Sequence, residues 1–277
     1  MSYAKRFRVE PGVSINLEEI DADFSPKGLD RDEGEKRFRD LTVELRDLQH
    51  LMYAEDRRSL LIVLQGRDAA GKDGTIRHVF GPMNPQGTRV TNFKVPSKEE
   101  LAHDFLWRCH RATPKRGTVG IFNRSHYEDV LVVRVHDLVA EKVWSKRFDH
   151  INAFERLLAD NGTVILKFYL HIDRDEQLER FKQRIENPKK NWKISNADYA
   201  ERPYWDAYTE AFQDALSKCS TDIAPWFIVP ANRKWARNLV IADIVAETMN
   251  GLGMSFPKPE ADMEEIRREY HEAEEAG

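Results

Sequence analysis

The feature that most constrains this chain is a glycine-rich loop, residues 66–74, between an apolar segment and the start of a helical pattern. Residues 60–64 are Leu-Leu-Ile-Val-Leu, which is typical of a buried strand. Gly66 and Gly71-Lys72 have the G-x-x-x-x-G-K spacing of a phosphate-binding loop. Glycines let backbone N–H groups approach phosphate oxygens, and the helix N-terminus and Lys72 add positive charge. The loop therefore predicts an α/β protein that binds phosphate.

One position of the loop departs from the usual motif. A Ser or Thr normally follows the lysine and ligates magnesium, but Asp73 stands there in this chain. Asp68 and Asp73 bring negative charge beside a phosphate site, where it repels the ligand unless a divalent metal lies between them. The flanking strand and helix argue against a chance match in a Gly-rich turn. We therefore predict a metal-dependent phosphoryl site at which Asp68 is essential.

Composition and charge limit the class of protein. The 277 residues, 41% hydrophobic and 32% charged, suit one large domain with appendages or two small domains. The net charge of −4 gives no global basic field, so we expect no nucleic-acid partner. No apolar run approaches the roughly 20 residues of a membrane span, so we expect no membrane partner. Cys109 and Cys219 are too few for a disulfide scaffold and have no metal-binding spacing, which favours a reduced, cytoplasmic protein.

Periodicity divides the chain into three segments. Residues 1 to about 31 are punctuated by Pro and Gly, and we expect an irregular arm there. Residues 32–56 predict a helix with one apolar stripe, made of Phe38, Leu41, Leu45, Leu48 and Met52. The stripe is short, which favours packing on its own domain over a coiled-coil seam. We predict an arm and helix at 1–57, a phosphate-loop domain at 58–255 and an acidic tail at 256–277.

Four further segments have strand patterns, which makes about five strands with the one before the loop. They are Arg89–Phe93, Val119–Phe122, Thr163–Ile172 and Pro225–Pro230. Ser97 and Glu100 form a capping-box signal, and the helix that they open carries Leu101, Phe105, Leu106 and Trp107. A further helix is expected through Leu239, Ile241 and Ile244.

Polar side chains follow two of these strands. The run from Asn123 to Asp129 comes directly after a buried strand, at a position where phosphate-loop proteins carry an acidic residue for the metal. Arg124 is well placed to neutralise phosphate charge, whereas His126 is as readily explained as a structural residue. Lys94 lies between a strand and a helix, where ligand contacts are common, although spacing alone favours a solvated lysine.

Residues 174–218 have the pattern of a helical lid. Residues 174–186 predict a helix with Arg180 and Arg184 on one face, and Pro188 ends it. A basic loop with Lys189, Lys190 and Lys193 follows. Ser195 and Asp198 then cap another helix. Closing such a lid expels water and adds positive charge around a transferred group.

Three motifs together resemble the type 2 polyphosphate kinases, over roughly residues 35–255. They are Gly66–Gly74, Asn123–Asp129 and the run Asn187-Pro188-Lys189-Lys190-Asn191-Trp192-Lys193. Asp73 after the lysine is a feature of that family. The resemblance implies a P-loop kinase-like, thymidylate-kinase-like three-layer α/β sandwich with a parallel sheet and a helical lid. It implies reversible transfer of the terminal phosphoryl of inorganic polyphosphate to AMP and ADP, with Mg²⁺ as cofactor and Mn²⁺ as a substitute.

The resemblance also implies roles for individual residues. Asp68, Lys72 and Arg124 are the expected catalytic residues, with Asp68 at the metal, assisted by Asn123 or Glu128. The nucleotide is expected at Lys94, Asn123, Arg124 and Glu128. Phosphate and polyphosphate are expected at Gly66, Ala69, Ala70, Gly71, Lys72, Asp73, Gly74, Arg77, Arg180, Arg184, Lys189 and Lys193. Asn123 stands where some branches carry Asp, which together with Glu128-Asp129 indicates the branch that phosphorylates both AMP and ADP. A homo-oligomer, a dimer of dimers, is also implied.

Two other functions fit parts of the pattern. An ATP-dependent nucleotide or small-molecule kinase on the same fold is disfavoured by Asp73 and by the basic density of the lid. A regulator that binds nucleotide or polyphosphate without catalysis is disfavoured by Asp68, because a simple anion binder gains nothing from a carboxylate there.

Overall fold

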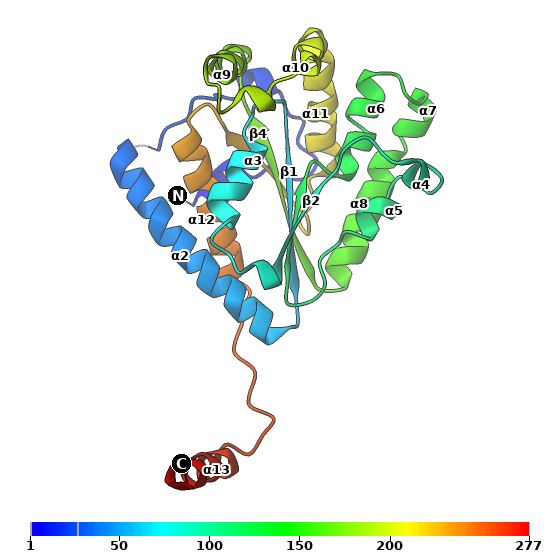
Figure 1. Cartoon of the computed structure of the whole chain (residues 1–277). Helices are drawn as coiled ribbons and strands as arrows, with labels where there is room; N and C mark the ends of the chain where they lie inside the picture. Colours follow the sequence, from blue (N-terminus) through cyan, green and yellow to red (C-terminus); the bar gives the residue numbers. More distant parts are fainter. Residues whose placement is uncertain (1, 27, 277) are drawn as a thin grey trace.

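The computed structural model describes residues 2–26 and 28–276. A five-stranded sheet lies between two layers of helices (Figure 1). Its strands are β1 (Ser59–Gly66), β2 (Thr88–Asn92), β3 (Val119–Asn123), β4 (Thr163–His171) and β5 (Trp226–Pro230). The order across the sheet is β2-β3-β1-β4-β5 and every neighbouring pair is parallel, so all five carboxyl ends lie at one edge. The predicted fold class and the five predicted strands are confirmed.

Helices connect successive strands and form the two layers. The α-helices are α1 (Tyr3–Phe7), α2 (Arg31–Glu55), α3 (Lys72–Thr75), α4 (Lys98–Leu101), α5 (Trp107–His110), α6 (Val132–Val135), α7 (Glu141–Trp144), α8 (Arg147–Asp160), α9 (Arg174–Glu186), α10 (Asn196–Ala200), α11 (Trp205–Cys219), α12 (Lys234–Asn250) and α13 (Met263–Ala276). Single turns are η1 (Leu17–Glu19), the π-helical η2 (Ile76–Phe80), η3 (Pro85–Gly87), η4 (His126–Asp129), η5 (Asn191–Lys193) and η6 (Arg202–Tyr204). In the described residues, no helix combines the length and the apolar character that crossing a bilayer requires.

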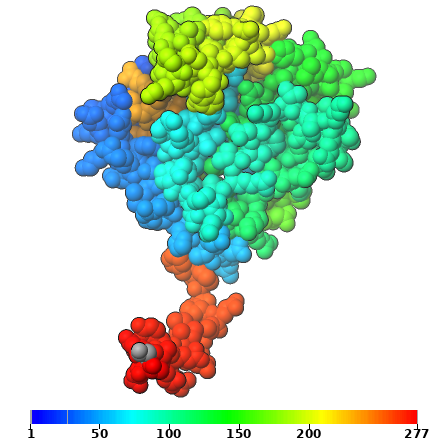
Figure 2. Space-filling view, in the orientation of Figure 1, coloured from blue at the N-terminus to red at the C-terminus, as the bar shows by residue number. Residues whose placement is uncertain are grey.

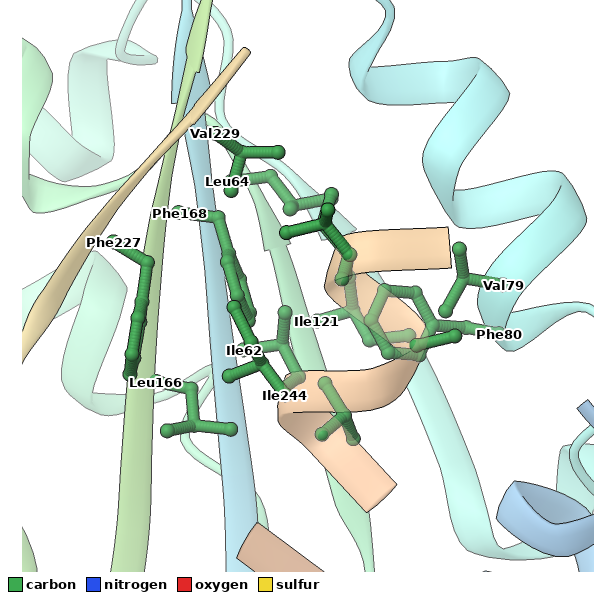
Figure 3. Close-up of a cluster of buried hydrophobic side chains, with 14 of the residues drawn as sticks. Ile62, Leu64, Val79, Phe80, Ile121, Leu166, Phe168, Phe227, Val229 and Ile244 are labelled. Carbon is green, nitrogen blue, oxygen red and sulfur yellow. The ribbon is translucent and has the colours of Figure 1, made fainter. Parts of the chain in front are cut away.

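The central strand β1 is buried on both faces, which explains its unbroken apolar sequence. Leu60, Ile62 and Leu64 belong to the core under α2 and α12, and the alternate residues Leu61 and Val63 belong to the core under α8 and α11. The first of these cores also contains residues of β3, β4 and β5 (Figure 3). Burial on both sides holds the carboxyl end of β1, and with it the phosphate loop, in a fixed place.

Helix α2 packs against α12 on the outside of that core. Leu45 and Met52 of the apolar stripe are fully buried, and the remaining stripe residues pack against the same cluster. Asp30 and Glu33 form a capping box at the start of the helix, which fixes its first turn. The expectation that the stripe packs on its own domain is therefore confirmed.

Two expected helices are broken, each for a local reason. After α4, the Asp104 carboxylate accepts from the backbone N–H of Leu106 at 2.9 Å, and this local bond replaces a helical one before α5 begins. The helix expected after Ser195 ends as α10, because Pro203 has no N–H to continue it, and α11 starts afresh at Trp205. The capping boxes at Ser97 and Ser195 are both present as predicted.

The two terminal segments behave differently. The arm is not wholly irregular, since it contains α1 and η1, and its Val9, Leu17 and Phe24 are buried against the body. In contrast, every described residue of α13 is exposed, and the helix stands away from the body at the end opposite the lid (Figure 1). The lid, from α9 to α11, lies over the carboxyl edge of the sheet (Figure 1) and forms the yellow-green top of the molecule (Figure 2).

Candidate active site

The phosphate loop connects β1 to α3 at the carboxyl edge of the sheet. Its backbone is left-handed at Ala69, with φ of 62°, and at Gly71, with φ of 109°. At Gly66, an added Cβ atom would lie 2.9 Å from the carbonyl oxygen of Leu170 on β4, so the strand and the loop approach too closely for a side chain. The loop is thus a turn with unusual backbone angles, as an anion-binding loop of this spacing requires.

Lys72 opens α3 and folds back over its own loop. Its Nζ donates to the carbonyl oxygen of Gly66 at 2.7 Å and to that of Arg67 at 3.1 Å. Burial, and then the nearby positive charge of Arg124, lower the pKa of Lys72 to about 8, although Asp68 acts in the opposite direction. Burial thus disfavours the charged form of Lys72, and an anion bound at the loop would stabilise that charged form.

Arg124 joins the second predicted motif to the loop. Its Nη2 donates to Asp68 Oδ1 at 2.8 Å, and its Nη1 lies 3.4 Å from Glu128 Oε2. Arg124 has a φ of 60°, and its backbone N–H donates to the carbonyl oxygen of Leu64 on β1. The expected catalytic residues Asp68, Lys72 and Arg124 are thus brought together, although Arg124 lies more than fifty positions after the other two.

Asn123 ends β3 and links the loop to β2. Its side-chain amide donates to Asp73 Oδ1 at 2.8 Å and to Asn92 Oδ1 at 2.7 Å. Asp73, which replaces the Ser or Thr of the common motif, is therefore held by a hydrogen bond from Asn123 on the neighbouring strand. The amide nitrogen of Asn123 faces Asp73, which leaves only its oxygen to face a cation or a ligand.

The side chains present fit a magnesium ion that is bound largely through substrate. No three His, Cys, Asp or Glu side chains of the described ranges gather as a ready-made metal site. Mg²⁺ commonly binds through one or two carboxylates, several waters and substrate phosphates. Asp68 suits that arrangement, because its Oδ1 is bonded to Arg124 and no described donor is bonded to its Oδ2. A metal there would lower the repulsion between Asp68 and phosphate.

The first lid arginine has a different role from the one expected. Arg180 on α9 is buried, and its five N–H donors are all occupied. They bond Glu176 Oε1 and the carbonyl oxygens of Ala69, Ala70, Ala231 and Asn232 at 2.5–3.0 Å. The expectation that Arg180 grips polyphosphate is therefore revised: it ties the base of the lid to the phosphate loop and to the end of β5.

The basic residues further along the lid are more available. Arg184 donates to the carbonyl oxygen of Lys193 at 2.9 Å and lies 3.6 Å from Asp198, which braces the basic loop. Lys190 and Lys193 line the central cavity, whereas the predicted Lys189 does not. One position along this loop is enough to turn a lysine away from the cavity.

These elements enclose a cavity of about 1140 Å³ between the phosphate loop, α2, the lid and the start of α12. Eleven of its lining residues are Arg or Lys and five are Asp or Glu, although the whole chain carries a net charge of −4. The surplus of positive charge is thus local, as a polyanion site in an acidic protein requires.

The remaining predicted residues divide between this cavity and other positions. Ala69, Gly71, Asp73, Gly74 and Arg77 line it, together with Asn123 and Arg124. Gly66 and Ala70 are not among the lining residues. Glu128 is not among them either, but it lies beside the Arg124 guanidinium, which is. Lys94 is exposed and lies outside the lining, which favours the solvated lysine that its spacing suggested.

The rest of the second motif is buried beneath the site. His126 is fully buried, and its Nε2 lies 3.1 Å from Glu155 Oε1. Glu155 also accepts from Tyr127 at 2.9 Å and from Lys167 at 2.5 Å. Burial raises the pKa of Glu155, but Lys167 and His126 outweigh that effect and hold its pKa below the ordinary value. His126 is therefore structural, and this network supports the loop that carries Arg124.

Five basic residues of the cavity were not among the predicted site residues. One is Lys190 in the lid loop; Arg31 and Arg39 come from α2, and Lys234 and Arg237 come from α12. Arg31 and Arg39 each belong to a charged helix face, which from the sequence is indistinguishable from a solvated one. The basic run Arg233-Lys234 at the end of β5 was the only available signal for the second pair.

Comparison with known proteins agrees with this geometry. The sequence model of the family described as Polyphosphate kinase 2 matches residues 28–255. This chain belongs to the polyphosphate kinase 2 family. A polyphosphate kinase 2 crystal structure from Arthrobacter aurescens TC1 superposes with a TM-score of 0.95 at 39% identity, over 98% of this chain and 97% of that one. The family resemblance inferred from the three motifs is confirmed.

Curated members of the polyphosphate kinase 2 family match over nearly the whole chain. An AMP/ADP-polyphosphate phosphotransferase of Meiothermus ruber is 48% identical, over 95% of this chain and 98% of the relative. An ADP-polyphosphate phosphotransferase of Rhodopseudomonas palustris is 45% identical, over 92% of both chains. The similarity extends beyond the three motifs to the arm and the lid.

Proposed function

We propose that this protein transfers the terminal phosphoryl group of inorganic polyphosphate to AMP and to ADP, which gives ADP and ATP, and that the reaction is reversible. The observation that carries the proposal is the cavity, in which a phosphate loop with two carboxylates and Lys72 is surrounded by ten further basic residues. Such a site suits a dense polyanion and a nucleotide phosphate together. The names of the Meiothermus and Rhodopseudomonas relatives support the same acceptors.

Each group at the loop has a role in this proposal. Lys72 and Arg124 hold the phosphoryl group that moves, and Asp68 positions Mg²⁺, or Mn²⁺ as a substitute. Asn123 and Glu128 act on the nucleotide side, next to Arg124. Arg184, Lys190 and Lys193 hold the polyphosphate chain from the lid. Charge developing on the transferred group is stabilised by these fixed positive groups and by the metal, which supplies Lewis-acid stabilisation when bound.

The transfer is proposed to be direct. The bond between the terminal phosphorus and its bridging oxygen breaks as an oxygen of the nucleotide phosphate forms the new bond, and polyphosphate leaves one unit shorter. Neither cysteine is available as a nucleophile, because Cys109 and Cys219 are both buried and burial raises the pKa of each thiol to about 12. Direct transfer predicts that labelled polyphosphate without nucleotide leaves no label on the protein, and a labelled phosphoenzyme would contradict it.

The decisive experiment is a nucleotide assay. Purified protein is mixed with Mg²⁺, long-chain polyphosphate and either AMP or ADP, and the products are separated by ion-exchange chromatography. ADP and ATP from AMP would support the full proposal, whereas ATP from ADP alone would restrict the acceptor to ADP. No product from polyphosphate, with ATP consumed against another acceptor, would favour an ordinary ATP-dependent kinase. Tight binding without turnover would favour a regulator.

We also propose a cytoplasmic homo-oligomer, a dimer of dimers. Two buried free thiols suit a reducing compartment. Val43 and Tyr53 on the outer side of α2 are about half exposed, which suits a contact surface between copies. Light scattering coupled to size-exclusion chromatography tests the assembly, and a monomer at micromolar concentration would contradict it.

A further inference from the structure

The guanidinium group of Arg237 is buried directly against the phosphate loop, in the wall of the cavity. The side chain comes from α12 and its residue is only 2% exposed. Its Nη1 donates to the carbonyl oxygen of Ala70 at 3.1 Å. Its Nε and Nη2 both donate to the amide oxygen of Asn238, at 3.2 and 2.8 Å. All of these acceptors are neutral, so no described carboxylate is bonded to this buried cation.

A second cation lies beside it. Arg180 donates to the same carbonyl oxygen of Ala70, at 3.0 Å. Burial, and then the charge of Arg180, lower the pKa of Arg237 to about 9, and no carboxylate within residues 2–26 and 28–276 opposes the two effects. Arg180 has Glu176 as an ion partner, whereas the acceptors that the described residues offer to Arg237 are all neutral. Burial of an unpaired charge destabilises a folded protein, so the arrangement calls for a counter-charge from elsewhere.

The loop itself is shaped around this group. A Cβ atom on Gly71 would lie 1.8 Å from Arg237 Nη1, and one on Gly74 would lie 3.4 Å from Nη2. The guanidinium therefore packs against this turn, and both belong to the lining of the cavity. A positive charge held this close to the loop attracts phosphate oxygens bound there, and it offsets the negative charges of Asp68 and Asp73 in the same cavity.

We propose that Arg237 is a positioning residue whose missing counter-charge is the phosphate anion bound by the loop, and that the neutral amide of Asn238 keeps this charge uncompensated. The expected ligand is a phosphate group of inorganic polyphosphate. The choice of polyphosphate rests on the proposed function. The electrostatic inference does not, because Arg237 would attract any phosphate chain that binds at the loop.

The variant Asn238→Asp tests this inference with almost no change of shape. The new carboxylate accepts from Nε and Nη2 as the amide oxygen does, and it neutralises Arg237 in place. In phosphate-free buffer we expect the variant to melt at the wild-type temperature or above it. We expect its affinity for tripolyphosphate, measured by calorimetry without metal or nucleotide, to fall at least about tenfold.

Two further variants complete the test. Asn152→Asp adds the same charge on α8, which covers the other face of the sheet, and should change the affinity less than about twofold. Arg237→Met removes the charge and keeps the length of the side chain, and should weaken tripolyphosphate binding as Asn238→Asp does. If Asn238→Asp does not fold, Arg237→Met decides the matter.

Wild-type affinity in Asn238→Asp, or in Arg237→Met when that variant decides, would overturn the inference. So would an equal loss in Asn238→Asp and Asn152→Asp, since net charge alone would then explain it. A purely structural Arg237 would give a lower melting temperature with unchanged affinity. Because the titration contains no acceptor, a negative nucleotide assay would count against the proposed function and leave this result standing.

Discussion

At the scale of single residues, the site depends on charged side chains that lie close together and are hydrogen-bonded to one another or to the loop backbone. Asp68 faces Arg124, Asp73 faces Asn123, and Lys72 reaches back to two carbonyl oxygens of its own loop. Each of these residues is tied to the protein by contacts that a ligand can supplement without displacing. Small changes of charge at fixed shape are therefore the most informative perturbations.

Asp68→Asn should lower kcat/KM with polyphosphate by about 10²–10³-fold while leaving the fold intact. The amide oxygen can still accept from Arg124, so the shape is kept, but the carboxylate that suits Mg²⁺ is lost. Steady-state kinetics and thermal melting measure the two effects. Asp206→Asn, on the outer end of α11, is the matched control and should keep activity. A fully active Asp68→Asn protein would show that the carboxylate is not needed.

The lowered pKa of Lys72 predicts a pH dependence of anion binding. In the free protein the ammonium group loses its proton near pH 8 rather than near the ordinary 10.5, so its attraction for phosphate disappears as pH rises through that range. The affinity for tripolyphosphate should fall about tenfold per pH unit above about pH 8. Lys72→Met should bind weakly with no break there. Calorimetry in a pH series measures both, and a constant wild-type affinity to pH 10 would contradict this assignment.

Stability should change in the opposite direction. Between about pH 8 and 10.5 the unfolded chain binds a proton at Lys72 that the folded chain does not, so this group's contribution to the free energy of unfolding increases with pH. Below about pH 8 both states are protonated, and the cost of burying the charge is fully present. Comparing denaturant midpoints of wild type and Lys72→Met across this range isolates the contribution.

At the scale of elements, the lid has a fixed base and an accessible basic loop. Arg180 anchors α9 to the phosphate loop and to the end of β5, while Lys190 and Lys193 extend over the cavity from the loop around η5. A movement that closes the lid would therefore involve the part beyond Arg184 more than the base. Anchored bases with mobile tips are typical of lids that exclude water during transfer.

Replacing both Lys190 and Lys193 by Ala should raise the KM for long-chain polyphosphate about three- to tenfold, because two contacts between exposed lysines and a polyanion are lost. The KM for ADP should change less. Lys189→Ala is the matched control, since it removes the same charge from the same loop outside the cavity lining. Equal effects of Lys189→Ala and of the double variant would show that only the net charge of the lid matters.

At the scale of the whole molecule, the two ends of the chain differ in what they cover. The arm runs along β5, where the backbone N–H of Val9 donates to the carbonyl oxygen of Trp226 at 2.8 Å. It also buries apolar side chains against the body. The tail helix α13 is exposed throughout. The arm therefore belongs to the folded unit, and α13 does not contribute to the core.

Two truncations should reflect this difference. Removal of residues 258–277 should leave the melting temperature within about 2 °C of wild type and keep phosphotransfer. Removal of residues 1–24 should cost about 5 kcal/mol, because Val9, Leu17 and Phe24 lose their burial, and it should expose the edge of β5. Thermal melting and solubility measure both. A stable, soluble protein without the arm would contradict the role inferred from its contacts.

The sequence by itself determined the local features of this protein. The glycine spacing of the loop, the strand before it, the capping boxes at Ser97 and Ser195 and the helix at 174–186 all appear in the structure as expected. Such features depend on residues a few positions apart, so their physical causes can be read along the chain. The three motifs also identified the family. Helix α8 was not predicted, and nothing was inferred from its segment.

Only the tertiary structure decided which charged side chains reach the cavity. Arg180 and Arg184 share a helix face, yet packing against the loop and β5 occupies the donors of Arg180 and leaves those of Arg184 near the basic loop. Arg237 and Asn238 are adjacent residues in an ordinary helix, and only the approach of α12 to the phosphate loop gives them a role. The physical reason is that burial and charge compensation depend on contacts between distant segments, which local sequence does not contain.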